Sequence, residues 1–386
     1  MKYYTNLFSQ MLHVIKRTDF EKAVREHKAE AHSKGFSSWD HFAAMLFAQL
    51  GRAQSLREIS YGLRTCLGKL NHLGMKKAPP RSTLSYANNH RPWELFQSIF
   101  YQVLSQCQMI TPGHKFRFKN KLLSLDATVI DLCLSLFPWA EYRRTKGAVK
   151  LHLLLDHDGY LPVYAHITEG KTHEINIARK LSFPAGSIVA YDRGYVDYSF
   201  FQECTDNDVY FVTRQKKNAK YAVVEERKIP KYRNILSDQI IKVTDYYSIK
   251  KCTSLLRRVV VWDAKKKKEI VLWTNHLKFG ASTIAAIYKE RWQIEIFFKT
   301  IKQNLRIKTF IGTTANALKT QIWTALIAIL LIKYMKLRSR TNWSMSNLIA
   351  MLRFNLFTYR DLWEWLKNPY NIQPIGPLIE QPEFVF

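Results

Sequence analysis

The chain has 386 residues, of which 59 are basic and 31 acidic, giving a formal net charge of +28 at pH 7. This length predicts two or three folding units, and the 22 Phe, 20 Tyr and 10 Trp argue against a disordered chain. The surplus of positive charge indicates a polyanionic partner, for which nucleic acid is the usual candidate and an anionic membrane the alternative.

Membrane insertion and disulfide bonding are both disfavoured by the sequence. The N-terminus has no continuous apolar core of a secretory signal, and the longest apolar run, residues 322–332, is too short to span a bilayer. We therefore expect a cytoplasmic, nucleoid-associated protein with no membrane partner, and a buried helix at this run. The five cysteines are an odd number, widely scattered and without a C-x-x-C pair, so any metal should be held by oxygen atoms.

Residues 1–75 predict helices, and we expect them to form a DNA-binding domain followed by a helical connector at 76–115. A helix starts near residue 38, and Ser55 with Glu58 predicts a capping box for the next one. Helices near 55–65 and 82–90, joined by a basic segment with two prolines, resemble a helix-turn-helix. Arg81, Ser82, Thr83 and Ser85 would then meet a DNA groove, whereas a purely structural bundle is the alternative.

Strands are predicted from about residue 116, and they define an α/β domain that extends to residue 335. Two alternating strands flank a tight turn at Asp158–Gly159, and helix, strand, helix and strand follow. Residues 215–275 predict a β-rich insertion. Residues 206–275 contain 17 basic and 8 acidic side chains, so we favour a DNA-backbone surface over a solvated accessory sheet. One helix is predicted at 281–305, and residues 336–386 predict a helical C-terminal segment.

A row of polar side chains is predicted on one face of the 281–305 helix. Tyr288, Arg291, Glu295 and Lys302 fall within roughly 60° of each other at 100° per residue. A separate apolar stripe can bury the helix without covering this row. A carboxylate flanked by a phenol and two cations suits a metal ion beside a phosphodiester. The alternative is a solvated face in which Arg291 and Glu295 form an i, i+4 ion pair.

Two further carboxylates, Asp126 and Asp192, fall in or at the end of predicted strands. Asp126 lies inside an apolar strand, where a charge is costly unless paired or metal-bound, and Asp192 ends a later strand just before Gly194. A hydrogen-bonded core aspartate and a turn cap are the structural alternatives. Helix capping is our explanation for the rival acids Glu169, Glu174 and Asp197, and Glu290 should point away from Glu295.

Three dispersed motifs resemble one known family. The pattern Tyr288-x2-Arg291-x3-Glu295-x6-Lys302, the D-x-T motif at Asp126 and the DRGY motif at Asp192 are similar to those of DDE transposases of the insertion-sequence-four family. The resemblance implies a ribonuclease H-like catalytic core and a catalytic triad of Asp126, Asp192 and Glu295.

The resemblance also implies the ligands. The triad would bind two Mg²⁺ or Mn²⁺ ions, and Tyr288, Arg291 and Lys302 would bind phosphates near the transposon end. We expect Arg193 of the DRGY motif to contact DNA as well. The partners would be double-stranded DNA, as transposon ends and as target, with a homodimer in the synaptic complex. Some relatives hold a flipped base in an aromatic pocket, for which Trp292 and Trp273 are candidates.

The resulting prediction is a DNA transposase that binds the terminal inverted repeats of an insertion sequence, cleaves the strands and transfers them. Two alternatives stay open from the sequence: a metal-dependent nuclease on the same core that does not transpose, and a domesticated, non-catalytic DNA-binding protein.

Overall fold

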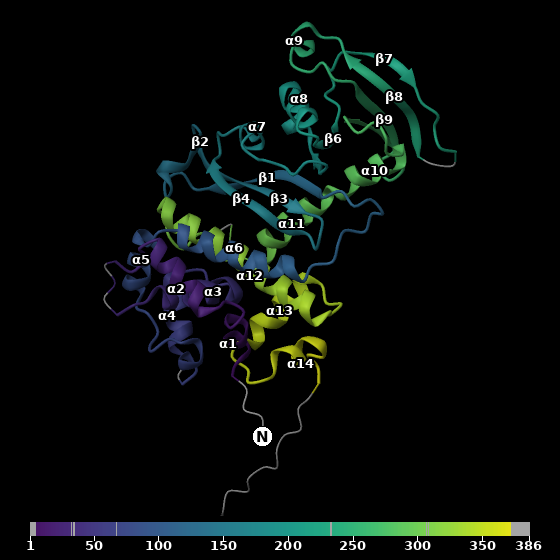
Figure 1. Cartoon of the computed structure of the whole chain (residues 1–386). Helices are drawn as coiled ribbons and strands as arrows, with labels where there is room; N and C mark the ends of the chain where they lie inside the picture. Colours follow the sequence, from purple (N-terminus) through teal and green to yellow (C-terminus); the bar gives the residue numbers. More distant parts are fainter. Residues whose placement is uncertain are drawn as a thin grey trace, which may run out of the picture.

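A computed structural model of the chain describes residues 5–31, 33, 35–66, 68–231, 234–305, 307 and 309–371. The first four residues of the predicted N-terminal domain and residues 372–386 of the predicted C-terminal segment lie outside this range. The described part has a mixed α/β architecture, in which one large sheet crosses the middle of the molecule (Figure 1).

The sheet has ten strands in the order β2-β3-β1-β5-β6-β10-β9-β8-β7, and β4 pairs with β3. β1 is antiparallel to β3 and parallel to β5, which is in turn parallel to β6. The strands are β1 Leu122–Leu132, β2 Glu141–Arg143, β3 Lys146–Asp156, β4 Leu161–Glu169, β5 Ile188–Tyr191, β6 Tyr210–Arg214, β7 Tyr221–Glu226, β8 Ile235–Val243, β9 Leu256–Asp263 and β10 Lys268–Thr274.

Helices cover both faces of this sheet. In Figure 1, α6 and α12 lie below β1, β3 and β4, the N-terminal helices lie below them, and α7 and α8 lie above. The helices are α1 Leu7–Leu12, α2 Arg17–Glu26, α3 Ser38–Gly51, α4 Leu56–Arg64, α5 Arg81–His90, α6 Glu94–Met109, α7 Glu174–Ala178, α8 Tyr198–Asp206, α9 Tyr246–Ile249, α10 Ala281–Glu290, α11 Trp292–Asn304, α12 Ala315–Ser339, α13 Met345–Asn355 and α14 Leu362–Lys367, with short 3₁₀ helices at η1 Leu70–Leu73, η2 Pro138–Ala140 and η3 Arg193–Tyr195.

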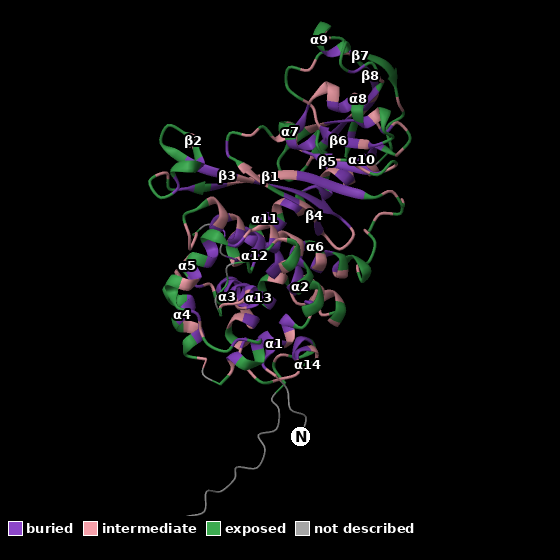
Figure 2. Cartoon of the chain, turned by 60° about the vertical axis from the view of Figure 1, so that its left-hand side comes forward, coloured by how far each residue is buried: buried purple, intermediate pink, exposed green. Residues whose placement is uncertain are grey.

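The apolar run at residues 322–332 forms the middle of α12. This helix is long and apolar enough to cross a membrane, but 83% of its most apolar window is buried inside the protein. It packs against α3 and α6, and Figure 2 shows it buried at the centre of the helical layer. The prediction of a buried core helix at this run is therefore confirmed.

The β-rich insertion extends the core sheet instead of forming a separate one. β10 pairs with β6 through Trp273 and Thr213, and β9, β8 and β7 follow outward. A buried ion pair holds this extension together, because the Arg257 guanidinium donates to both carboxylate oxygens of Asp238 at 2.7 Å. Arg257 also donates to the carbonyls of Leu277 and Phe279, just before α10, so the extension is tied to the helix that follows it.

Three local expectations need correction. Ser55 caps α4, but the Glu58 carboxylate accepts the N–H of Gln54 at 2.9 Å instead of that of Ser55, so the capping box is incomplete. Helix α5 begins at Arg81 after Pro80, because proline fixes an extended approach to the first turn, and Ser82 lies inside it. The helix expected at 281–305 is two helices, α10 and α11, that meet at Arg291.

The break at Arg291 is small and lies beside contacts made by the neighbouring Glu290. The Arg291 backbone keeps near-helical angles (φ −49°, ψ −30°), so the chain direction changes little. The neighbouring Glu290 carboxylate does not contact the Arg291 side chain. It forms an ion pair with Lys115 at 2.5 Å and accepts a hydrogen bond from the Tyr160 hydroxyl at 2.7 Å. These opposed contacts fix the junction between α10 and α11, and Glu290 points away from Glu295 as predicted.

The Asp238–Arg257 pair predicts a large loss of stability on substitution. Asp238→Ala leaves a buried guanidinium without its carboxylate, which should lower the free energy of unfolding by about 3–5 kcal/mol. The exposed Glu269 on β10 provides the control, since Glu269→Ala should change it by less than about 0.5 kcal/mol. Urea denaturation of the full chain measures both values, and equal values for the two variants would contradict this account.

Candidate active site

The pairing of two strands places Asp126 beside Asp192. Parallel pairing of β1 with β5 matches Leu125 with Tyr191, so Asp126 and Asp192 follow at the same level on strands roughly 4.8 Å apart. Side chains alternate along a strand, so Asp126 shares a face with Leu122, and Asp192 shares a face with Ile188. Leu122 and Ile188 pack in one cluster with α10, so both carboxylates belong to the face that α10 covers.

Arg291 connects the first of these carboxylates with Glu295. Its Nη2 donates to Glu295 Oε1 at 2.6 Å, and its Nη1 lies 3.5 Å from Asp126 Oδ2. The Arg291 side chain is only 9% exposed, so this guanidinium is a largely buried cation between two carboxylates. The structure therefore brings Asp126 and Glu295 together across 169 positions of sequence through one side chain.

Arg291 keeps unused hydrogen-bonding capacity. Its Nε and Nη1 atoms are buried and find no hydrogen-bond acceptor among the described residues. The guanidinium lies 5.5 Å from the centre of the Tyr288 ring, so the phenol and the guanidinium of the predicted row are adjacent. Buried donors without an acceptor are rare in folded proteins and call for an explanation. An oxyanion that enters the site would supply it.

The carboxylates perturb each other. Burial raises the pKa of Asp126 to about 7, the Ala127 N–H and Arg291 oppose this rise, and the charges of Asp192 and Glu295 add to it. Asp192 and Glu295 therefore both lie within electrostatic range of Asp126. Asp192 also accepts the N–H of Gly194 at 2.6 Å, so it caps the short η3 turn as the structural alternative expected.

The remaining predicted residues take different positions. Lys302 donates to the Val129 carbonyl at 2.8 Å and so reaches the same strand as Asp126, and Arg193 is exposed at the start of η3. Trp292 follows Arg291 directly, is 53% exposed and lies under the Lys266 ammonium at 5.7 Å. Trp273 is 1% exposed, packed inside the sheet, and we therefore withdraw it as a candidate for base stacking.

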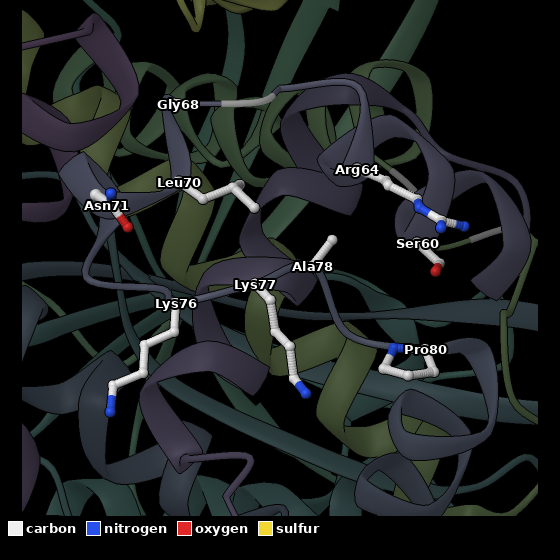
Figure 3. Close-up of a pocket in the computed structure, with 9 residues that line it drawn as sticks. All are labelled: Ser60, Arg64, Gly68, Leu70, Asn71, Lys76, Lys77, Ala78 and Pro80. Carbon is white, nitrogen blue, oxygen red and sulfur yellow. The ribbon is translucent and has the colours of Figure 1, made fainter.

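The predicted DNA-contacting residues of the N-terminal helices lie at the surface. Arg81 and Ser82 are exposed at the start of α5, and Thr83 is half-buried. Next to them is a cavity of about 530 Å³, lined by Ser60, Arg64, Gly68, Leu70, Asn71, Lys76, Lys77, Ala78 and Pro80 (Figure 3). Three of these residues are basic and none is acidic, so the cavity attracts anions.

The oxygen atoms of Asp126, Asp192 and Glu295 suit a hard divalent cation, although the three carboxylates do not surround one common position. Three carboxylates that face one edge of the sheet offer only oxygen atoms, which Mg²⁺ and Mn²⁺ prefer. Within the described ranges, no three His, Cys, Asp or Glu side chains already surround a single position. Arg291 explains this, because its guanidinium lies between Asp126 and Glu295 and neutralises them.

Two further residues lie beside this site: sequence reasoning explained Glu174 by helix capping and did not name Lys150. Glu174, at the start of α7, has an oxygen close to Gly194 and to the Asp192 carboxylate, and it provides no side-chain cap for its helix. Lys150 of β3 lies 3.5 Å from Glu174. The capping explanation holds for Asp197, which accepts the N–H of Phe200, but not for Glu174. Only the packing of α7 beside η3 reveals this proximity.

Comparison with known proteins identifies the family of this chain. Residues 117–331 match the family described as "Transposase DDE domain", and residues 5–76 match a domain of unknown function. The first match covers more than half of the chain, which therefore belongs to the DDE transposases, enzymes that cleave DNA and transfer the cut strands.

Two curated relatives carry names of the same kind. A "Probable transposase for insertion sequence element" of Geobacillus stearothermophilus is 28% identical over 71% of this chain and 72% of its own length. A "Putative transposase" of Sinorhizobium fredii is 29% identical over 79% of this chain and 84% of its own length. Both relatives are consistent with the insertion-sequence-four family.

A solved structure of the piggyBac transposase synaptic complex with hairpin DNA is also similar, with a TM-score of 0.46 and 11% identity. The similarity covers 96% of this chain and 81% of that one.

The buried Arg291 predicts a pH-dependent loss of stability. Arg291→Met removes the cation between two carboxylates, and without metal it should destabilise the chain by about 3–5 kcal/mol. Burial raises the pKa of Asp126 to about 7 and Arg291 opposes this rise, so Arg291→Met should raise this pKa further. At pH 6 Asp126 is mainly protonated in both chains, whereas at pH 8.5 only the parent has Arg291 to stabilise the ionised carboxylate. The variant should therefore lose on the order of 1–2 kcal/mol more at pH 8.5 than at pH 6.

Urea denaturation in the presence of a chelator measures this difference. The control is Arg193→Met, which removes an exposed arginine next to the same site and should have little effect at either pH. An equal cost of Arg291→Met at both pH values would show that Asp126 does not depend on Arg291.

Proposed function

We propose that this transposase binds the terminal inverted repeats of its own insertion sequence, cuts the DNA there, and joins the freed 3′-hydroxyls to target DNA. Asp126, Asp192 and Glu295 are the proposed catalytic and metal-binding residues, and two Mg²⁺ or Mn²⁺ ions are the proposed cofactors. The observation that carries this proposal is the contact of one buried guanidinium with both Asp126 and Glu295, while Asp192 follows on the neighbouring strand.

The strand order supports a ribonuclease H-like core. The path is β4-β3-β1-β5-β6, with β3 antiparallel to β1 and with β5 and β6 parallel to it, and it follows the predicted order of strands around a tight turn, then helix, strand, helix and strand. Residues 7–109 contain only helices among the described elements before β1, which supports an all-α N-terminal domain. The sites of chemistry in open α/β sheets lie at strand ends, where Asp192 is placed.

Divalent ions supply an activated oxygen nucleophile and stabilise the departing oxygen in phosphodiester chemistry. The protein's part is to hold three carboxylates at fixed positions. Strand register does this for Asp126 and Asp192, and α11 does it for Glu295 through an apolar stripe of Ile294, Phe298 and Ile301, each at most 6% exposed.

Arg291, Tyr288, Lys302 and Arg193 are the proposed phosphate contacts. The buried Nε and Nη1 atoms of Arg291, which have no hydrogen-bond acceptor among the described residues, support this role, since a guanidinium donates strong, charge-assisted hydrogen bonds to phosphate oxygens. Tyr288 lies beside this guanidinium, and Lys302 reaches β1 from the far end of the same helix. Arg193 is exposed and would contact a DNA phosphate next to the three carboxylates.

The N-terminal helices are the proposed site of end recognition. Arg81, Ser82 and Thr83 at the start of α5 would meet the DNA groove, and the basic cavity beside them would take a backbone phosphate. Two transposon ends must be held together for strand transfer, so we propose a homodimer in the synaptic complex, acting on double-stranded DNA at the nucleoid.

Loss of the carboxylates predicts loss of cleavage. Purified protein with Mg²⁺ and a labelled DNA that carries the end of its element should nick at the boundary. Asp126→Asn and Glu295→Gln should reduce nicking by at least about 100-fold, because an amide does not replace a carboxylate on the ion.

Asp131→Asn serves as the matched control for this experiment, because it changes an exposed acid on the same strand. Both catalytic variants should still shift the end DNA in a gel. Undiminished nicking by these variants would refute the mechanism, and equal nicking of unrelated DNA would identify a nuclease without end specificity.

Loss of the basic side chains that line the cavity should make DNA binding weaker and less dependent on salt. The triple substitution of Arg64, Lys76 and Lys77 by alanine should weaken binding to end DNA and to unrelated DNA alike. The slope of log K against log salt should become less steep by about 1 for each phosphate that the variant no longer binds.

The control variant loses the same number of positive charges at another surface. It replaces the exposed residues Lys16, Lys22 and Arg25, at the start of α2 or within it, by alanine. An unchanged salt slope in the cavity variant, or an equal change in the control, would exclude the cavity as a DNA-binding surface.

A further inference from the structure

Gly194 lies between two carboxylates, one of which belongs to no predicted motif. A Cβ atom built on Gly194 would lie 2.7 Å from Glu174 Oε2 and 3.0 Å from Asp192 Oδ1. The two oxygens are therefore no farther apart than the sum of these two distances. They face the same small space, which stays open only because residue 194 has no side chain.

Glu174 is the first residue of α7, where a carboxylate is favourable near the helix N-terminus, but it provides no cap, and the helix is only five residues long. Its one ion pair within the described residues is with Lys150, at 3.5 Å, whereas the same ammonium donates to the Thr172 carbonyl at the shorter distance of 2.9 Å. Lys150 is thus mainly bound to backbone, and Glu174 is only partly neutralised.

Tyr195 provides an independent sign that something binds here. Its side chain is fully buried, and its hydroxyl has no hydrogen-bond partner among the described residues. Burial raises the pKa of this phenol, and the charges of Asp126, Glu174 and Asp192 raise it further, so all three carboxylates lie within electrostatic range of the hydroxyl. A buried phenol without a partner costs free energy that a bound ion and its water would recover.

We propose that Glu174 is a fourth carboxylate of the metal centre and that it binds a divalent cation together with Asp192. This inference rests on the proposed metal-dependent function and adds a ligand that lies outside the three sequence motifs. Four carboxylates around two ions would leave Asp126 and Glu295 on one side, with Arg291, and Asp192 and Glu174 on the other, with Lys150.

Lys150 and Glu174 allow this role to be separated from a structural one. If their ion pair only holds α7 against β3, removing either partner has the same kind of effect. If Glu174 binds a cation, Lys150 competes with that cation. Glu174→Gln should then weaken metal binding, while Lys150→Met should leave it unchanged or strengthen it.

Titration of Mn²⁺ into the full-length protein without DNA, followed by the electron paramagnetic resonance of free Mn²⁺ and by calorimetry, tests this directly. Glu174→Gln should weaken Mn²⁺ binding by roughly 10- to 100-fold, in the range typical for loss of a group that supports a metal site. Glu169→Gln is the matched control, because it removes an exposed acid five residues away and should change the affinity by less than about twofold.

Gly194→Ala provides a second variant that retains every charge. Its new methyl group would occupy the space between the two carboxylates, and the flexible end of Glu174 can move away, so the chain should still fold. This variant should weaken Mn²⁺ binding to a similar extent as Glu174→Gln. Thermal denaturation without metal should show both variants folded, with midpoints within a few degrees of the parent.

The outcomes distinguish this inference from the proposed function. Absence of Mn²⁺ binding by the parent chain would overturn the metal centre as a whole. Mn²⁺ binding by the parent that Glu174→Gln and Gly194→Ala leave unchanged, or that Lys150→Met weakens as much as Glu174→Gln does, would overturn the role of Glu174 alone.

Discussion

The buried guanidinium of Arg291 holds together parts of the chain that are far apart in sequence. Asp126 belongs to the central strand β1 and Glu295 to helix α11, and neither carboxylate could lie next to the other without a positive charge between them. The helix is placed by two kinds of force, since its apolar stripe packs below β1 while Arg291 fixes its rotation about its own axis. A change at Arg291 would therefore alter the direction of Glu295 as well as the local charge.

The insertion between Asp192 and Glu295 keeps this geometry intact because it continues the sheet. β10 pairs directly with β6, the strand next to β5, so the chain leaves the core and returns to it along one edge. Arg257 contacts carbonyls just before α10 while it is paired with Asp238 on β8. The extension thereby supports the start of α10. The candidate-site residues lie farther along α10 and α11.

The sequence was sufficient for elements set by local patterns. Alternation of side chains predicted β3, β4 and the turn at Asp158–Gly159, and the stripe from Ile287 to Leu305 predicted which side of α10 and α11 is buried. The approach of Asp126 to Glu295 was implied by the family resemblance of the three motifs. Features that depend on partners distant in sequence were missed.

The break at Arg291 shows why. No glycine or proline marks it, and it lies beside the contacts of Lys115 and Tyr160 with Glu290, which are distant in sequence. The burial of Trp273 depends on how β10 adds to β6, and the place of Glu174 depends on how α7 packs beside η3. Each of these requires a pairing between segments that composition and periodicity do not specify.

Charge balance links the two halves of the site. In the described structure Arg291 pairs with Asp126 and Glu295, and Lys150 lies near Glu174 and neutralises it only in part. If divalent ions took over that neutralisation, as proposed above, Arg291 would no longer have to pair with two acids, and its N–H groups would be available to an oxyanion. The same side chain would then stabilise the folded chain before DNA binds and hold a phosphate afterwards. Under this proposal, such a double use would account for an arginine that is buried between acids yet retains donors without acceptors.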